Sequence, residues 1–233
     1  MSYVLLRQMA DGSVHKMSQQ EIITRVRVTY YKGEDLRFIS HLDMQRLWER
    51  LLRRSGLPIR YSQGYHPRAR LNLASALPLG FTSEVEILDF WMNEFWSIEE
   101  IYDRLTASAP PGLTIKSLEY VELSENALQT RIKASIYQVK FYDNQLKEQI
   151  STKAQSLLDA DQIIHTRRKK TYDLRPLILD IKIKEDIVSS QLMLILELCA
   201  EPGATGRPDE VLSELGYQNT DYWVKRTAII LDS

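Results

Sequence analysis

The sequence predicts an α+β fold built from two tandem ferredoxin-like units, each with the element order β-α-β-β-α-β, behind a short N-terminal appendage. Three observations predict it: segments that alternate apolar and polar residues, segments whose apolar residues recur at helical spacing, and an element order that repeats after a polar connection. We expect the appendage at residues 1–24, the first unit at 25–124 and the second at 131–233. A single mixed α+β domain without duplication remains the alternative.

Local turn and capping signals indicate the appendage. Asp11 and Gly12 form a dipeptide typical of a hairpin turn. Ser18 and Glu21 have the spacing of a capping box, which predicts a helix start. We therefore expect a short hairpin and a short helix before the main body.

The first unit starts with an alternating strand at Arg25–Tyr31. A helix follows, because Ser40 and Asp43 have the spacing of an acidic capping box and Gly56 is a typical C-terminal signal. Its apolar residues lie at helical spacing, and its arginines fall largely on the other face. The remaining expected elements are strands at Arg68–Ala74, Glu84–Trp91 and Thr114–Leu123, and a helix at Ile98–Ala107 capped by Ser97 and Glu100.

The second unit shows the same order with little residue identity to the first. Pro208 at a first helical position, followed by two acidic residues, opens a short helix that Gly216 ends. The other expected elements are strands at Lys133–Phe141, Leu177–Ile183, Gln191–Cys199 and Tyr222–Leu231, and a helix at Leu146–Leu158.

Composition excludes several classes of protein. Hydrophobic residues make up 44% of the 233 residues, which is too many for a disordered chain. No apolar run reaches the roughly 18 residues of a membrane span, and no secretory signal is visible, so we expect a cytoplasmic protein. The single cysteine, Cys199, excludes an internal disulfide and a cysteine-held zinc or iron–sulfur centre. We expect no metal or other cofactor in this chain.

Charge is unevenly distributed. The net charge is −1, but residues 25–70 hold eleven basic and four acidic residues. A second basic run lies at Arg167–Lys170. Such asymmetry is typical of an anion-binding surface, although solvated charged faces give the same pattern.

The loop Tyr61–Arg68 carries aromatic residues between Arg60 and Arg68, a pattern that indicates exposed rings interleaved with arginines. Planar rings for stacking bases and cations for phosphates are what single-stranded nucleic acid requires. A packed loop that covers the sheet edge is the alternative. If the outward face of Arg68–Ala74 meets the arginine face of the helix, the two form a cationic groove. The candidate nucleic-acid-binding residues are Arg50, Arg53, Arg54, Arg60, Tyr61, Tyr65, Arg68, Arg70, Arg167, Arg168, Lys169 and Lys170.

Two histidines are the candidates for catalysis. His41 lies in the first helical turn, where the helix dipole disfavours its protonated form, and His66 lies in the Tyr61–Arg68 loop. Ser40 and Asp43 fit better as caps than as catalysts. His41, Asp43 and His66 would form a metal site only if the loop folded back over the helix start. No phosphate-binding glycine-rich loop is present.

Several motifs in order resemble the bacterial radical-SAM-linked proteins, which carry a domain of unknown function. The resemblance covers about residues 25–231 and implies a radical SAM partner, because members are encoded beside or fused to a radical SAM protein, often near an E/G-type ribonuclease. Those associations imply RNA metabolism or modification. The motifs are Arg37–Asp43, Arg53–Pro58, Tyr61–Pro67, Ala76–Gly80, Asp173–Pro176, Arg207–Leu212 and Arg226-Thr227.

These observations favour a non-catalytic RNA-binding or substrate-presenting accessory protein of a radical SAM enzyme. Because the chain has one cysteine, radical chemistry would belong to the partner. One alternative is a metal-independent RNA-processing enzyme with His and Tyr as acid–base residues. Another is a protein–protein interaction module, which predicts an apolar patch without a cationic groove.

Overall fold

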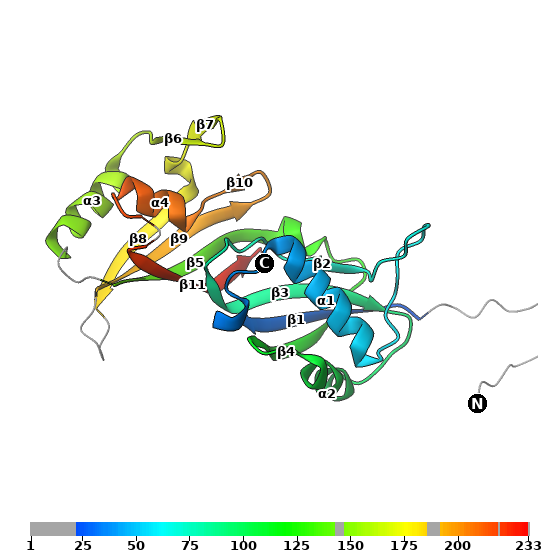
Figure 1. The fold of residues 1–233 in the computed structure, drawn as a ribbon. Coiled ribbons are helices and arrows are strands. Elements are labelled where there is room, and N and C mark those ends of the chain that lie inside the picture. Colours follow the sequence, from blue (N-terminus) through cyan, green and yellow to red (C-terminus); the bar gives the residue numbers. More distant parts are fainter. Residues whose placement is uncertain (1–21, 143–146, 186–191, 219, 233) are drawn as a thin grey trace, which may run out of the picture.

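The protein has a mixed α+β architecture around one nine-stranded sheet (Figure 1). The computed structural model describes residues 22–142, 147–185, 192–218 and 220–232. The α+β class predicted from the sequence is confirmed. The hairpin and capping box expected before residue 22 lie outside the described residues. Within the described part, no helix combines the length and apolar character that a membrane crossing requires.

The first half has the element order predicted for it. Strand β1 pairs antiparallel with both β3 and β4, and β2 pairs antiparallel with β3, which gives the strand order β4-β1-β3-β2. The elements are β1 (Thr24–Lys32), α1 (His41–Ser55), β2 (Leu71–Leu73), β3 (Thr82–Met92), α2 (Ile98–Ser108) and β4 (Leu113–Val121).

The second half repeats this pairing scheme. Strand β5 pairs antiparallel with β9 and β11, and β8 pairs with β9, which gives the order β11-β5-β9-β8. The elements are β5 (Ile132–Phe141), α3 (Lys147–Asp159), β8 (Ile178–Glu185), β9 (Leu192–Glu201), α4 (Pro208–Glu214) and β11 (Tyr222–Leu231). The sequence did not predict β6 (Ile164–Arg167), β7 (Lys170–Asp173) and β10 (Ala204–Thr205), nor the short 3-10 turns η1 (Glu34–Leu36), η2 (Leu128–Arg131) and η3 (Arg175–Leu177).

Capping fixes the two helices of the first half as the sequence predicted. The Ser40 hydroxyl accepts a hydrogen bond from the Asp43 amide at 3.2 Å, and Gly56 ends α1 in the left-handed conformation at a φ of 69°. At α2, Ser97 and Glu100 form a complete capping box. Ser40 and Asp43 therefore act as caps.

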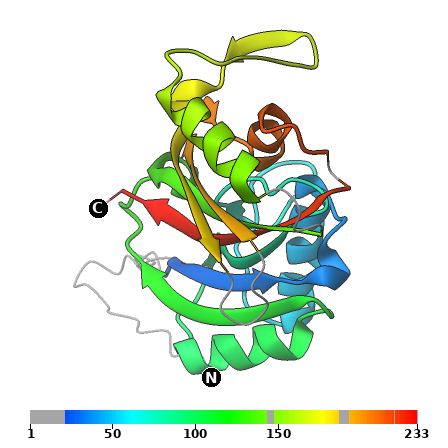
Figure 2. The ribbon, with the colours of Figure 1, turned by 90° about the vertical axis from the view of Figure 1, so that its left-hand side faces the viewer.

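The two halves share one sheet because β11 pairs in parallel with β3, through Lys225 with Thr82 and Arg226 with Ser83. Leu77 and Phe81, from the segment before β3, also pack into the core of the second half. Helices α1 and α4 lie on the same side of the joined sheet in both views (Figures 1 and 2). The junction between the halves is therefore a packed interface.

The strand expected at Arg68–Ala74 is shorter than predicted. Only Leu71–Leu73 forms a strand along β3. At the next positions of that edge, Ile59 bridges Met92 and the Arg60 amide donates to the Trp91 carbonyl at 2.7 Å. Upstream of β2, Tyr61 forms a bridge with Ala69, so the preceding residues turn back on themselves as a separate loop. Alternation alone could not reveal this competition for one strand edge.

Candidate functional site

The structure does not bring the first set of candidate arginines together. Arg50, Arg53 and Arg54 project from the exposed side of α1, whose other side packs on the sheet. Ala69 belongs to the core under that helix, so the adjacent Arg70 points to the opposite face of the sheet. There its guanidinium lies 4.4 Å from the centre of the Trp91 ring. The cationic groove expected between these arginines does not form.

The Tyr61–Arg68 loop is exposed throughout and projects from the end of the first half (Figure 1, cyan). The Ser62 amide donates to the Arg68 carbonyl at 2.8 Å, which closes the loop at its base. Tyr65 is 96% exposed and meets the His66 ring edge-on at 5.2 Å. At the base, Arg60 donates to the Asn93 side chain at 3.1 Å.

The two candidate catalytic histidines are far apart. His41 opens α1 and His66 follows its C-terminal end, and a helix of this length spans about 20 Å. Both side chains are exposed, and neither forms a hydrogen bond with another described residue. One side of the His41 residue nevertheless lines a small cavity with Tyr30, Lys32 and Glu86, and this partial burial lowers its pKa below the usual 6.5. Within the described part of the chain no three metal-ligating side chains come together, so His41, Asp43 and His66 do not form a joint site.

The second basic run forms the tip of a hairpin that the sequence did not predict. Strands β6 and β7 pair through Arg167 and Lys170, and the turn between them holds Arg168 and Lys169 at φ values of 44° and 70°. Left-handed backbone is uncommon for such residues and is found at functional positions. The turn exposes three cationic side chains, Arg168, Lys169 and Lys170, beside the second half of the sheet.

A cleft of about 580 Å³ lies between this hairpin and the first half. We call it the junction cleft and define it by Arg37, Phe38, Leu79, Arg167, Arg168 and Arg207. Phe38 is 74% exposed, and the Arg37 guanidinium lies 5.1 Å from its ring centre. The cleft thus combines four arginines with an exposed ring.

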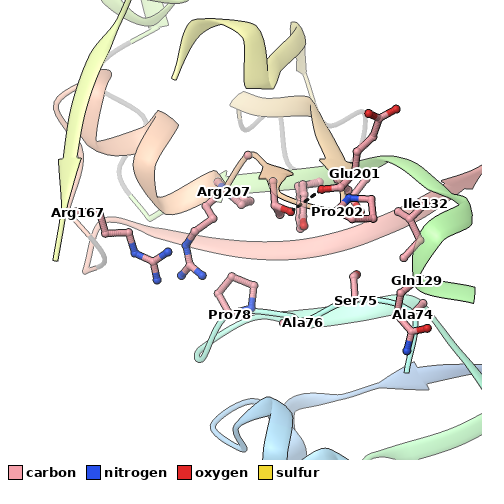
Figure 3. A pocket seen from close by; sticks show the side chains of 16 residues that line it. Ala74, Ser75, Ala76, Pro78, Gln129, Ile132, Arg167, Glu201, Pro202 and Arg207 are labelled. Atoms are coloured by element: carbon pink, nitrogen blue, oxygen red, sulfur yellow. Dashed lines mark hydrogen bonds between the residues drawn. The ribbon is translucent and has the colours of Figure 1, made fainter. Parts of the chain in front are cut away.

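Glu210 holds two of these arginines in place. Its carboxylate is 4% exposed and lies 3.5 Å from Arg167 Nε and 3.7 Å from Arg207 Nε. The Tyr172 hydroxyl donates to the same carboxylate at 2.5 Å. Figure 3 shows the two guanidinium groups directed toward Pro78 across the cleft. Glu210 and Arg207 therefore hold the lining of the cleft in position, in addition to their place at the start of helix α4. The Arg207 side chain does not cap that helix.

A buried group of ionisable residues lies at the junction, and we call it the polar cluster: Tyr30, Lys32, Glu86 and Arg226. Arg226 is 0% exposed, lies 3.3 Å from Glu86, and donates to the Ser75 hydroxyl at 2.7 Å. Burial lowers the pKa of Lys32 from 10.5 to about 8, although the Glu86 charge opposes this change. Burial likewise raises the pKa of Tyr30 well above 10. Perturbed groups of this kind are concentrated at functional sites.

Sequence reasoning found only part of this site. Arg167 and Arg168 were among the predicted binding residues, whereas Arg37 and Phe38 entered only as part of the family motif Arg37–Asp43. Arg207 and Arg226 were weaker candidates that also belong to the family motifs, and they were not among the predicted binding residues. One further signal was available, because Tyr222, Val224 and Arg226 alternate on one face of β11, which places an arginine in line with buried residues.

A family profile described as an uncharacterized protein conserved in bacteria, DUF2344, matches residues 25–208. The chain belongs to this family. The match includes the segments that form the junction cleft on both sides. No curated protein sequence is significantly similar to this DUF2344 protein.

Solved structures resemble this DUF2344 protein only distantly. A Cbf5-Nop10-Gar1 complex aligns with a TM-score of 0.47 and 7% identity, covering 88% of this chain and 48% of the other. An H/ACA RNP bound to a substrate RNA aligns with a TM-score of 0.44 and 7% identity, covering 88% and 47%. An archaeal box H/ACA Nop10-Cbf5 complex gives 0.43 and 8%, covering 88% and 48%. The chain spans about half the length of these matched chains.

Proposed function

We propose that this protein binds single-stranded RNA in the junction cleft. The observation that carries the proposal is the convergence of Arg37, Arg167, Arg168 and Arg207 on one cleft with the exposed ring of Phe38. Arginines neutralise phosphates, and an exposed ring offers a surface on which a base of any identity can stack. Three separate parts of the chain contribute these side chains.

The choice of RNA rests on the family resemblance, which implies RNA metabolism or modification. The cleft geometry supports a single strand, because a single strand exposes its bases to a ring such as Phe38. Acidic groups at Asp209 and Glu210 pair with the arginines, and they leave N–H groups of each guanidinium available for phosphate oxygens.

The test measures affinity for a fluorescent single-stranded RNA of about 12 nucleotides, a length within the usual site size. The cleft variant combines Phe38→Ala with Arg168→Gln. The matched control combines Leu42→Ala with Arg50→Gln on α1, where an equally exposed apolar residue and arginine are changed. We expect the cleft variant to lose at least about tenfold in affinity, the equivalent of one lost stacked base.

The control is expected to bind like the natural protein. If the control loses affinity and the cleft variant does not, the site belongs to the α1 arginines predicted from the sequence. If the natural protein binds no single-stranded RNA at low salt, the proposal is wrong.

We propose further that the bound RNA is presented to a radical SAM enzyme in the cytoplasm. The resemblance supports this partner, and the single cysteine assigns any cluster chemistry to it. Affinity purification from native cells, with co-purified RNA and protein both sequenced, tests the partnership. Recovery of RNA without a radical SAM protein would remove this part of the proposal and leave RNA binding standing.

A second candidate function is metal-independent RNA processing. The observation that favours it is the position of His41 in a small cavity shared with Tyr30, Lys32 and Glu86. Incubation of labelled RNA with the protein in the presence of a chelator tests for it. Cleavage that His41→Gln abolishes and His66→Gln preserves would support this function, and intact RNA in every sample would end it.

We also propose that residues 25–124 and 131–233 are two ferredoxin-like units. Their strand orders, β4-β1-β3-β2 and β11-β5-β9-β8, support this interpretation, as does a helix between the first and second strands of each unit. The interaction-module alternative has less support, because an apolar patch without a cationic groove was its requirement and the junction cleft carries four arginines.

A further inference from the structure

Next to the junction cleft lies a second cavity of about 380 Å³, which we call the inner pocket. Residues 74–78 line one wall and residues 200–208 line the other (Figure 3). Ser135 and Tyr137 of β5 also line the pocket. A volume of this size is within the range of sites that enclose a small ligand. The pocket therefore has room for a group as large as one nucleotide.

The walls of the inner pocket are largely apolar. Ala74, Ala76 and Pro78 face the gap from one side, and Pro202 and Pro208 face it from the other. Enzymes and binding proteins that extrude a base hold it between apolar or aromatic surfaces and read its edge with a few hydrogen bonds. The lining matches the surfaces that such a base requires.

A polar group at the base of the pocket lacks a partner. The Ser135 side chain is 1% exposed, and its hydroxyl forms no hydrogen bond within the described part of the chain. Buried hydroxyls are nearly always hydrogen-bonded, so one that lines a cavity without a protein partner bonds either to water or to a group that arrives with a ligand. A base edge supplies both donors and acceptors for it.

Fixed contacts hold both walls in position. Arg226 donates to the Ser75 hydroxyl at 2.7 Å and to the Ala76 carbonyl at 2.9 Å. Across the pocket, a Cβ on Gly206 would lie 2.7 Å from the Leu177 carbonyl oxygen, so only glycine allows this approach. The gap between the walls is thus set by the fold, and Arg226 acts as a positioning residue for it.

The inner pocket opens into the junction cleft. The two cavities share Pro78, Arg167 and Arg207. A strand lying in the cleft would therefore pass the mouth of the pocket with its phosphates at the two arginines. A nucleotide turned out of the strand at that point would place its base between the walls.

We propose that the inner pocket takes up one unstacked nucleotide of the bound single-stranded RNA. Arg167 and Arg207 hold the phosphate at the mouth, and Ser135 forms a hydrogen bond with the base edge. This inference rests on the proposed RNA binding, and it adds that the cleft selects one nucleotide for individual enclosure.

The test uses a single-stranded RNA that contains 4-thiouridine. Its length of about 12 nucleotides is typical of single-strand binding sites. After near-ultraviolet cross-linking, mass spectrometry maps the attached peptides. Cross-links are expected at Tyr137 or within residues 202–208. Ala76→Trp, which fills the pocket from an exposed position, is expected to reduce these cross-links at least about tenfold at saturating RNA and to lower overall affinity by about tenfold, the equivalent of one lost stacked base.

Ala107→Trp on the exposed side of α2 is the matched control and is expected to leave the cross-links unchanged. Ser135→Ala is expected to alter the order of affinities for the four homopolymer RNAs and to leave the salt dependence unchanged. RNA binding with cross-links confined to Phe38 and the β6–β7 hairpin would overturn the inner-pocket proposal alone. Absence of RNA binding would overturn both proposals.

Discussion

Two carboxylates on strand β3 lie three residues apart and have opposite surroundings. Asp89, on the face away from α1, accepts four hydrogen bonds from Arg25 and Arg27, at 2.6 to 3.0 Å. Glu86 lies in the polar cluster, where Arg226 approaches one of its oxygens at 3.3 Å without a hydrogen bond to it. Both oxygens of the Asp89 carboxylate therefore have hydrogen-bond partners, whereas one oxygen of the Glu86 carboxylate has none among the described residues.

The difference separates a carboxylate that binds two parts of the fold together from one that keeps an unpaired oxygen. The arginines around Asp89 also bind the connection between the halves, since Arg25 donates to the carbonyls of Glu125 and Asn126 and Arg27 donates to the Glu125 carboxylate. The unpaired oxygen of Glu86 belongs to a residue that lines one small cavity, and Ser75 lines both this cavity and the inner pocket. A fully hydrogen-bonded buried carboxylate stabilises the fold, whereas a buried oxygen without a protein partner costs free energy.

The largest expected effect tests the structural side of this comparison. Asp89→Ala would leave two buried guanidinium groups without their shared carboxylate, so we expect a loss of about 3–5 kcal/mol in the free energy of unfolding. Urea denaturation measures it. Glu119→Ala is the control, because this exposed residue meets the same Arg27 at 3.8 Å and is expected to cost less than about 1 kcal/mol. Equal losses in the two variants would show that Asp89 is not central to the fold.

The second prediction tests the polar cluster. Lys32 is 2% exposed, and its folded-state pKa of about 8 lies below its unfolded value near 10.5. The unfolded chain therefore holds the proton longer, and stability should rise as pH increases from 8 to 10.5. Below pH 8 the charged amine lowers stability by up to about 3 kcal/mol, at 1.36 kcal/mol for each pKa unit.

Lys32→Met is accordingly expected to raise stability at neutral pH and to remove this rise at alkaline pH. Urea unfolding of the natural protein and the variant at several pH values measures the difference in their free energies of unfolding. Titrating groups that both proteins share, including Tyr30, contribute equally and cancel from this difference. Lys116→Met, at an exposed position, is the control. A Lys32→Met protein that keeps the full alkaline rise would contradict the depressed pKa of Lys32.

A third prediction separates stability from function at the β6–β7 turn. Arg168 and Lys169 occupy left-handed positions that asparagine and glycine favour. Arg168→Asn with Lys169→Gly is therefore expected to stabilise the protein by about 1–2 kcal/mol in thermal or urea unfolding. The same variant should bind single-stranded RNA more weakly. Gain of stability with unchanged affinity would show that the turn does not contact RNA.

The smallest expected effect concerns salt. Four phosphate contacts in the junction cleft predict a slope of about −3 for log affinity against log salt concentration on a single strand. Arg168→Gln should reduce the slope by about 0.7, the value of one contact, whereas Arg53→Gln on α1 should leave it unchanged. Titration at several salt concentrations measures both. A reduced slope in the Arg53→Gln variant would return α1 to the RNA-binding surface.

Local sequence signals predicted local structure well. The caps at Ser40 and Ser97, the glycine that ends α1 and the alternating strands other than Arg68–Ala74 are found where the sequence placed them. Such features depend on residues a few positions apart. For the same reason, the α+β class and the order of the main elements followed from pattern alone.

Long-range features were missed for the opposite reason. The β6–β7 hairpin lacks the usual turn residues, so its Arg-Lys tip resembled a charged loop. The density of arginines between residues 25 and 70 suggested one surface, but Arg25 and Arg27 are buried with Asp89 and Arg70 lies on the other face from α1. The junction cleft draws on segments around residues 37, 167 and 207, which only the tertiary fold brings together.

The position of β11 in the sheet has a consequence for biogenesis. This strand lies between β5 and β3, although it is synthesised after nearly all of the second half. Until it emerges from the ribosome, β3 keeps part of one edge unpaired, and Leu77 and Phe81 lack the side chains of Tyr222 and Val224 beside them. Exposed strand edges and apolar side chains promote aggregation. Nascent chains of this protein are therefore expected to need chaperone protection until this last strand is released.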